Sequence, residues 1–159
     1  MDVTIEYAIL IPLLILQIFL FPIVVNSMMN NWVDSRQLIE LQETAGHLGS
    51  SIQQVYFSLN HTSILDGTLM NDLNLAPYIE GYSYTANASL RGVLEPPMNS
   101  TEILDITLRL VGTTITTTTS VTLGQNVVWI PSTFDSNTNQ TYLVAQKNND
   151  LITLSFGAT

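Results

Sequence analysis

YAILIPLLILQIFLFPIVV, residues 7–25, is the most apolar stretch of this 159-residue chain. Sixteen of its 19 residues are apolar, and apart from two prolines the exception is Gln17. No charged residue occurs between Glu6 and Asp34. At about 1.5 Å per residue, a helix over this stretch spans roughly 28 Å, close to the hydrocarbon thickness of a bilayer. The stretch therefore predicts a helix that either crosses a membrane or packs against other apolar helices.

The composition of the whole chain excludes several classes of function. Hydrophobic residues make up 46% and charged residues only 11%, and the formal net charge is −9. A chain this acidic lacks the basic surface that binds nucleic acid, and it is not drawn electrostatically to anionic lipid. The absence of cysteine excludes disulfides and thiolate metal sites. Away from the apolar stretch, the share of apolar residues is that of an ordinary soluble domain.

The residues that flank the apolar stretch bear on how it is used. A cleaved secretory signal has basic residues before a core of about 7–15 apolar residues and small residues after it. Here Asp2 and Glu6 come first, the core is longer, and no Ala-x-Ala site follows. The first basic residue of the chain is Arg36, which as a plain anchor would place the C-terminal part in the cytoplasm. That orientation depends on the lack of basic residues before the apolar stretch. A basic leader that preceded Met1 and was then removed would have supplied them.

Helical character continues beyond the apolar stretch. No proline occurs between Pro22 and Pro77, and apolar residues recur at alternating spacings of three and four. The seam consists of Leu38, Leu41, Ala45, Leu48, Ile52, Val55 and Leu59. We expect one helix from Thr4 to Leu59, about 84 Å long. Its second half is amphipathic and packs on the head, while its first half protrudes; Gly46 and Gly49 would permit close approach of another element.

Two prolines lie within the apolar half of this helix. Pro12 and Pro22 each remove a backbone N–H donor and clash with the preceding turn, which predicts kinks or local melting. Proline is also tolerated in membrane helices without any special role. Both interpretations stay open from the sequence.

The first 25 residues resemble a known family. Val3-Thr4-Ile5-Glu6-Tyr7, followed by Ala8-Ile9-Leu10-Ile11-Pro12-Leu13-Leu14, is similar to the mature N-terminus of type IV pilin-like proteins. The Ile-Glu-Tyr start resembles Flp pilins, and the Glu-x-Ala-x-x-x-Pro-Leu-Leu pattern resembles TadE-like pseudopilins. The resemblance implies an archaeal adhesive pilin or archaellin-like subunit that a prepilin peptidase and assembly machinery process.

By the same resemblance, the chain lies in the membrane before assembly and then forms a homopolymer through its helix. Glu6 matches the family's glutamate, which offsets a terminal amine inside the filament core, although it lies one position later than usual if Met1 is the first residue. A carboxylate near a helix start also interacts well with the helix dipole. The plainer interpretation is an interfacial carboxylate outside the lipid. The residues expected to act in assembly are Glu6, Tyr7, Pro12, Leu14, Leu20 and Pro22.

After Asn60 the pattern changes to that of a β domain. Residues 60–80 form a connector, with a short helical turn expected over 69–75. Alternation of apolar and polar residues and turn signals then predict strands near 82–89, 104–110, 115–123, 127–130, 142–147 and 151–156. The fold class is therefore α+β: a long N-terminal helix over 1–59 and an antiparallel β-sandwich head over 60–159, which we expect to be immunoglobulin-like.

The head is rich in hydroxyl side chains and carries four N-glycosylation sequons. These begin at Asn60, Asn87, Asn99 and Asn139, all beyond the apolar helix, as expected for a head outside the cell. Residues 113–119 contain six threonines, which suit an exposed strand face or a cluster of O-linked sugars.

No catalytic pattern is present in the sequence. His47 and His61 have no carboxylate partner that the sequence identifies, and no nucleophile-elbow, zincin or phosphate-loop motif occurs. Asp135 lies in a polar loop over 132–141, which is more typical of a solvated loop than of a calcium site. We therefore expect no enzymatic activity, no metal and no cofactor.

The sequence favours a structural subunit of an extracellular type IV pilus-like filament that serves adhesion or motility at the cell surface. The helices would bundle into the core and the glycosylated heads would form the sheath. One alternative is a single-pass, membrane-anchored binding module on the surface. Another is a minor pilin that primes or caps filaments.

Overall fold

A computed structural model describes the backbone of residues 3–93, 101–138 and 140–158. Two of the expected glycosylation sites, Asn99 and Asn139, lie outside these ranges. The chain divides into two compact units, Met1–Arg36 and Gln37–Thr159. The second half of the long helix thus belongs to the same unit as the β head, because its apolar stripe packs there.

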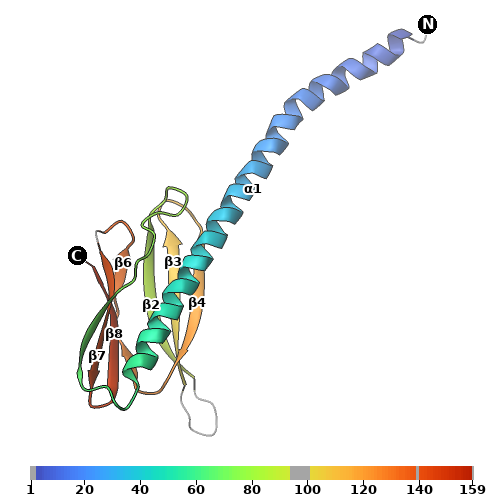
Figure 1. The fold of residues 1–159 in the computed structure, drawn as a ribbon. Coiled ribbons are helices and arrows are strands. Elements are labelled where there is room, and N and C mark those ends of the chain that lie inside the picture. The colour runs from blue at the N-terminus through green and yellow to red at the C-terminus, as the bar shows by residue number, and fades with distance from the viewer. Residues whose placement is uncertain (1–2, 94–100, 139, 159) are drawn as a thin grey trace. The chain divides into compact units, whose positions relative to one another are not determined.

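One helix, α1, runs from Val3 to Leu59 (Figure 1). This confirms the helix expected over residues 4–59. Pro12 and Pro22 lie inside it, and the helical assignment is unbroken at both. Local melting is therefore not observed, because the loss of one backbone donor at each proline leaves the neighbouring turns intact. The helix ends where Asn60 donates its N–H to the Tyr56 carbonyl at 2.8 Å, and a turn over residues 61–63 follows.

The head contains eight described strands in two four-stranded sheets. The first sheet has the order β1-β7-β8-β5 and the second β4-β3-β2-β6. Their bounds are β1 Gly67–Asp72, β2 Tyr84–Val93, β3 Thr101–Leu110, β4 Thr116–Leu123, β5 Val127–Trp129, β6 Thr133–Asp135, β7 Thr141–Asn148 and β8 Leu151–Ala158. All paired strands are antiparallel except β5 and β8, which pair in parallel. The fold class expected from the sequence, a long helix and a sandwich of mainly antiparallel sheets, is confirmed.

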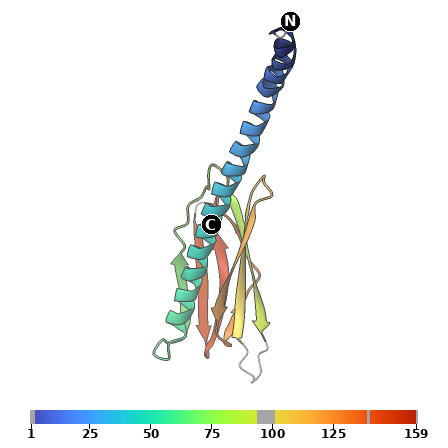
Figure 2. The same cartoon turned by 90° about the vertical axis from the view of Figure 1, so that its right-hand side faces the viewer.

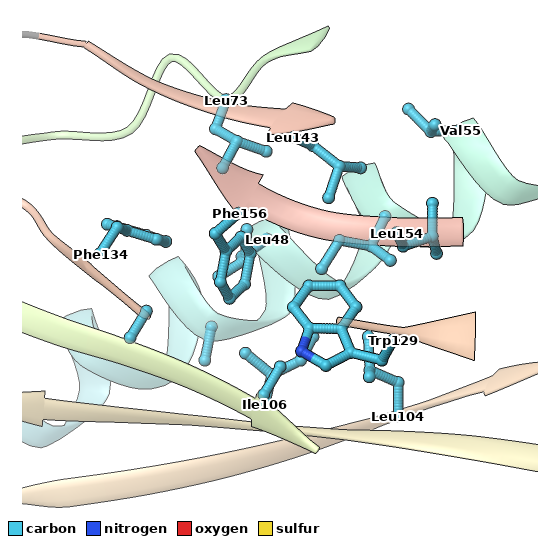
Figure 3. Close-up of a cluster of buried hydrophobic side chains, with 14 of the residues drawn as sticks. Leu48, Val55, Leu73, Leu104, Ile106, Trp129, Phe134, Leu143, Leu154 and Phe156 are labelled. Atoms are coloured by element: carbon cyan, nitrogen blue, oxygen red, sulfur yellow. The ribbon is translucent and has the colours of Figure 1, made fainter. Parts of the chain in front are cut away.

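The amphipathic half of α1 completes the core of the head. Six of the seven seam residues, from Leu41 to Leu59, are buried, and Leu38 at the start of the seam is 36% exposed. They join one hydrophobic cluster with inward-facing residues of both sheets. Figure 3 shows Leu48 and Val55 of α1 together with Ile106, Trp129 and Phe156. The heptad pattern therefore marks the face of α1 that packs against the sheets, along which the second half of the helix runs (Figure 2).

Gly49 lets the helix approach the second sheet. A Cβ at this position would lie 2.8 Å from Val121 Cγ1 and 3.5 Å from Thr119 Cγ2, both on β4. Such a contact is closer than packed carbon atoms allow, so the missing side chain is required here. Gly46 differs, since a Cβ there would meet nothing within 4 Å. Of the two glycines expected to permit close approach, the structure assigns that role to Gly49.

Two segments differ from the sequence expectation. The turn of helix expected over 69–75 is wrong, because β1 occupies Gly67–Asp72 and pairs along its full length with β7. The loop expected over 132–141 contains β6, which pairs with β2 from Thr133 to Asp135. Both are edge strands; β1 has no buried residue, and β6, with three residues of which Phe134 is buried, is too short to show a period. Sequence periodicity therefore gave no signal for them.

Candidate functional site

The apolar half of α1 presents its side chains to the surroundings on every side. Each residue from Ile9 to Leu20 is exposed, and Ile18, Phe19 and Phe21 are 68%, 69% and 67% exposed. Exposed apolar surface of this extent marks a membrane or protein contact. The helix is long and apolar enough to cross a membrane, and none of its most apolar window is buried within the structure as described.

The residues expected to act in assembly fall on this surface as far as the structure describes them. Leu14 and Leu20 are 47% and 49% exposed. Pro12 and Pro22 lie ten residues apart within the helix. The backbone of Glu6 and Tyr7 is helical, but their side chains lie outside the described part of the chain. The expected roles of these two side chains therefore stay predictions.

Gln17 is the polar exception on the apolar surface. Its exposed side chain borders two shallow hollows between apolar side chains. One hollow is lined also by Leu13, Leu16, Leu20, Phe21 and Val24, and the other by Leu14, Ile18 and Phe21. An amide in such surroundings needs hydrogen-bond partners once water is excluded.

The first charged residues after the apolar surface mark its end. Arg36 lies over the ring of Trp32, with 5.1 Å between its guanidinium carbon and the ring centroid. Between this pair and the apolar stretch, Met28 and Met29 are 67% and 60% exposed among asparagines and a serine. Indole rings and arginines are the side chains that favour a lipid–water boundary. This segment therefore suits the transition from apolar to aqueous surroundings.

The outer face of the second sheet is covered by hydroxyl and amide side chains. Thr107 on β3 and Thr118 on β4 are register partners, and their Oγ1 atoms lie 3.0 Å apart. One step along, Ser120 donates its hydroxyl to Asp105 at 2.6 Å. Alternate residues of β4 are exposed, as expected for half of a threonine-rich strand. The other half, including Thr119, faces inward toward Gly49 of α1.

Two of the expected glycosylation sites lie within the described residues, and both are exposed. Asn87 is on β2, opposite Thr107 on β3, so its side chain lies on the hydroxyl-rich outer face. Asn60 follows the end of α1, and its Oδ1 accepts a hydrogen bond from Asn126 Nδ2 at 2.8 Å. A glycan would attach to the other amide atom, Nδ2, so this hydrogen bond is compatible with modification.

Asn126 joins three parts of the head, which sequence reasoning missed. Its Oδ1 accepts a hydrogen bond from Tyr56 Oη at 2.7 Å. Its Nδ2 donates to Asn60 Oδ1 and to the Asp150 carbonyl at 2.7 Å. The helix end, the β4–β5 connection and the β7–β8 hairpin thus meet at one amide. No local pattern identifies such a residue, because its partners are distant in sequence.

Lys147 is a second residue that sequence reasoning missed. Its side chain is 4% exposed, and Nζ donates to the carbonyls of His61 and Ile64 at 3.1 Å and 3.0 Å. These carbonyls belong to the chain reversal after α1, so the lysine ties that reversal to β7. The signal was present: Leu143, Ala145 and Lys147 alternate, and alternation places the lysine inside.

Tyr84, within the described part of the chain, is a buried residue with a displaced pKa. Burial raises the pKa of Tyr84 from 10.0 to about 12, and its hydroxyl donates to the Ala76 carbonyl at 2.9 Å. His61 Nδ1 lies 2.7 Å from Ser63 Oγ, while His47 borders a shallow exposed hollow with Glu43 and Asn74. Asp135 is exposed on β6. Among the described residues, no three His, Cys, Asp or Glu side chains form a group that could hold a metal.

Comparison of the chain with protein-family models, with curated proteins and with solved structures gives no match.

Proposed function

We propose that this chain is the structural subunit of an extracellular type IV pilus-like filament that serves adhesion or motility. The observation that carries the proposal is the uncovered apolar surface over Ile9–Val24, on a helix whose second half is built into a separate β head. A helix that is apolar all round is stable only in lipid or against other apolar surfaces. Many copies of the same helix supply such surfaces to each other.

The energetics support a durable polymer. If each copy hides on the order of 1,000 Å² of apolar surface, about 25 cal/mol per Å² gives roughly 25 kcal/mol before ordering costs. That gain is measured against water. Transfer from lipid to a helix bundle gains little, because lipid tails are as apolar as leucine. The proposal therefore includes membrane residence before assembly and a machinery that extracts the subunit, after a prepilin peptidase has removed a leader.

The head supports the same function. The outer face of its second sheet is rich in hydroxyl groups. The exposed sequon asparagine Asn87 lies on that face, and Asn60 lies at the end of α1. Hydroxyl groups and sugars keep a surface soluble without net charge. In the proposed filament these heads form the sheath, and Glu6, Tyr7, Pro12 and Pro22 act in the core.

The test is a charge placed in the apolar surface. Leu14→Asp and Leu20→Asp should abolish filaments on the producing cells, because burying an unpaired carboxylate costs several kcal/mol. Gln42→Asp, an exposed position on the amphipathic half of α1, is the matched control and should leave filaments intact. Filaments are counted by negative-stain microscopy after shearing, and their main band is identified by mass spectrometry. Wild-type filament numbers in both leucine variants would exclude a helical core of this kind.

A second candidate is a single-pass, membrane-anchored binding module, which the membrane-compatible length of the apolar helix favours. In that case the wild-type chain stays in the membrane fraction and no sheared filament contains it. A minor pilin that primes or caps filaments is the third outcome, recognised when the chain is a trace component of filaments built from another subunit. Codons for a short Lys/Arg-rich leader upstream of Met1 would favour either pilin over the anchor.

A further inference from the structure

The apolar segment contains an imbalance of hydrogen-bonding groups. In a continuous helix each carbonyl accepts from the N–H four residues later. Pro12 and Pro22 have no N–H, so the carbonyls of Ala8 and Ile18 lack that donor. Gln17 brings two amide N–H donors to the same segment. Surplus acceptors and surplus donors are therefore carried by one stretch of chain.

These groups cannot satisfy each other within one copy. A helical side chain leans toward the N-terminus of its helix, so Gln17 lies over the preceding turn and away from the Ile18 carbonyl. The Ala8 carbonyl lies nine residues back, about 13 Å along the axis, beyond the reach of one glutamine side chain. Lipid tails offer neither donors nor acceptors. The complementary partner that the chain itself supplies is a second copy of the same segment.

The residue types around the two carbonyls distinguish them. Alanine lets a neighbouring helix approach its backbone closely, as small residues do in membrane helix pairs. The β-branched side chain of Ile18 and the exposed ring of Phe21 one turn further keep a neighbouring helix away from the Ile18 carbonyl. Ala8 also has bulky neighbours, Tyr7 and Ile9, but its own side chain is a single methyl group. The Ala8 carbonyl is therefore the acceptor that a neighbour's glutamine reaches more readily.

We infer that Gln17 of one copy donates its side-chain amide to the carbonyl of Ala8 that Pro12 leaves free in a neighbouring copy. The inference rests on the proposed filament. This hydrogen bond fixes the axial register of two copies. Ala8 of one copy lies level with Gln17 of the other when the two helices are shifted along their axes by about 13 Å, and the tilt of the glutamine side chain toward its N-terminus shortens this shift. A single polar contact in an apolar seam is a known way to specify register. Pro12 then serves assembly by freeing an acceptor.

The experiment compares subunit release from sheared filaments at rising temperature. Gln17→Met keeps the length and volume of the side chain and removes its amide. Pro12→Ala restores an N–H for the Ala8 carbonyl, and Pro22→Ala is the matched control that does the same for Ile18. Each proline change is also combined with Gln17→Met in a double-mutant cycle. We expect Gln17→Met filaments to form and to release subunits about five- to tenfold faster than wild-type filaments, the effect of one lost hydrogen bond. In each proline background, the effect of Gln17→Met is measured against the proline variant alone.

The double-mutant cycles show which carbonyl accepts the hydrogen bond from Gln17. Once Pro12→Ala is present, Gln17→Met should cause little further acceleration, whereas its effect should persist in the Pro22→Ala background. Release at the wild-type rate or slower for Gln17→Met overturns the inference, since Gln17 would then bond within its own helix. Coupling to Pro22→Ala instead of Pro12→Ala also overturns it. Absence of filaments from the wild-type chain contradicts the proposed function itself, which keeps the two failures distinguishable.

Discussion

Single side chains in the head connect segments that are far apart in the chain, and no sequence pattern identifies the partners of these side chains. Asn126, Ser136 and Lys147 each link segments far apart in the chain. Ser136 is buried, accepts the Tyr84 N–H at 2.8 Å and donates to the Pro77 carbonyl at 2.7 Å. A buried polar group without its partners costs about 1–3 kcal/mol, so the loss of one such side chain leaves several groups unpaired.

Asn126 offers the clearest test at this scale. Asn126→Ala removes all three side-chain hydrogen bonds and should lower the free energy of unfolding by about 2–3 kcal/mol. Asn126→Asp keeps an acceptor for Tyr56 but places a carboxylate oxygen against two acceptors, Asn60 Oδ1 and the Asp150 carbonyl, so its loss of unfolding free energy should be at least as large. Urea unfolding of the full chain in detergent measures both. Equal stability of Asn126→Ala and the wild type would contradict the role given to this amide.

Tyr84 predicts a dependence of stability on alkaline pH. Burial raises the pKa of its hydroxyl to about 12, against 10.0 when unfolded. Between these values the unfolded chain has released the proton that the folded chain retains, so stability falls as pH rises. The contribution of the Tyr84 hydroxyl to the unfolding free energy is complete below pH 10 and lost by about pH 12. Tyr84→Phe should flatten this part of the curve, measured as the difference in unfolding free energy between wild type and variant from pH 8 to 12.

At the scale of elements, how well the sequence predicted the structure depends on how regular and how buried each element is. Leu104, Ile106 and Leu108 alternate with polar residues and form the buried side of β3, so that strand was predictable. The seam from Leu41 to Leu59 was predictable for the same reason. β1 was not, because Gly67–Asp72 has no apolar side and depends on β7 for its backbone hydrogen bonds. Its pairing is a tertiary effect that local periodicity does not record.

The β7–β8 hairpin permits a stabilising change. Its two loop residues, Asn149 and Asp150, have φ values of 47° and 66°, the left-handed conformation that two-residue hairpin turns require. Asp150→Gly should raise the unfolding free energy by about 0.5 kcal/mol, because glycine adopts this conformation without strain. The bond from Asn126 to the carbonyl of residue 150 is retained. Asp150→Val should lower it by about 1–2 kcal/mol, since a β-branched residue is strained there; thermal unfolding by circular dichroism compares the two.

At the scale of the whole molecule, the two compact units differ in where their apolar side chains lie. The unit Gln37–Thr159 contains the hydrophobic cluster and the polar links described above. The unit Met1–Arg36 contributes exposed apolar side chains to its surroundings. This difference was predictable from the sequence, because the helix is apolar on all sides in its first half and has a single apolar stripe in its second half. The role proposed for Gln17 was not predictable from the sequence, because a single glutamine in an apolar stretch has no local pattern that identifies its partner.

This division predicts the behaviour of a shortened chain. Removal of residues 1–36 should leave a head that folds, stays monomeric and remains soluble without detergent, because its core is retained. Size-exclusion chromatography with light scattering and the cooperativity of thermal unfolding measure this. The shortened chain should also fail to enter the proposed filaments when it is produced beside the full-length protein. An aggregated or unfolded product would mean that the first unit is needed for the fold of the second.

The buried Lys147 has a consequence for proteolysis. It is the only lysine in the sequence, and the remaining basic residues are three arginines. With its amine held by two carbonyls, the folded head offers trypsin no exposed lysine. Amine-directed crosslinkers and labels likewise find no exposed lysine side chain on the folded head. Trypsin cleavage of the folded head is therefore expected at arginine alone, and Arg91 and Arg109 are the exposed arginines of its described strands.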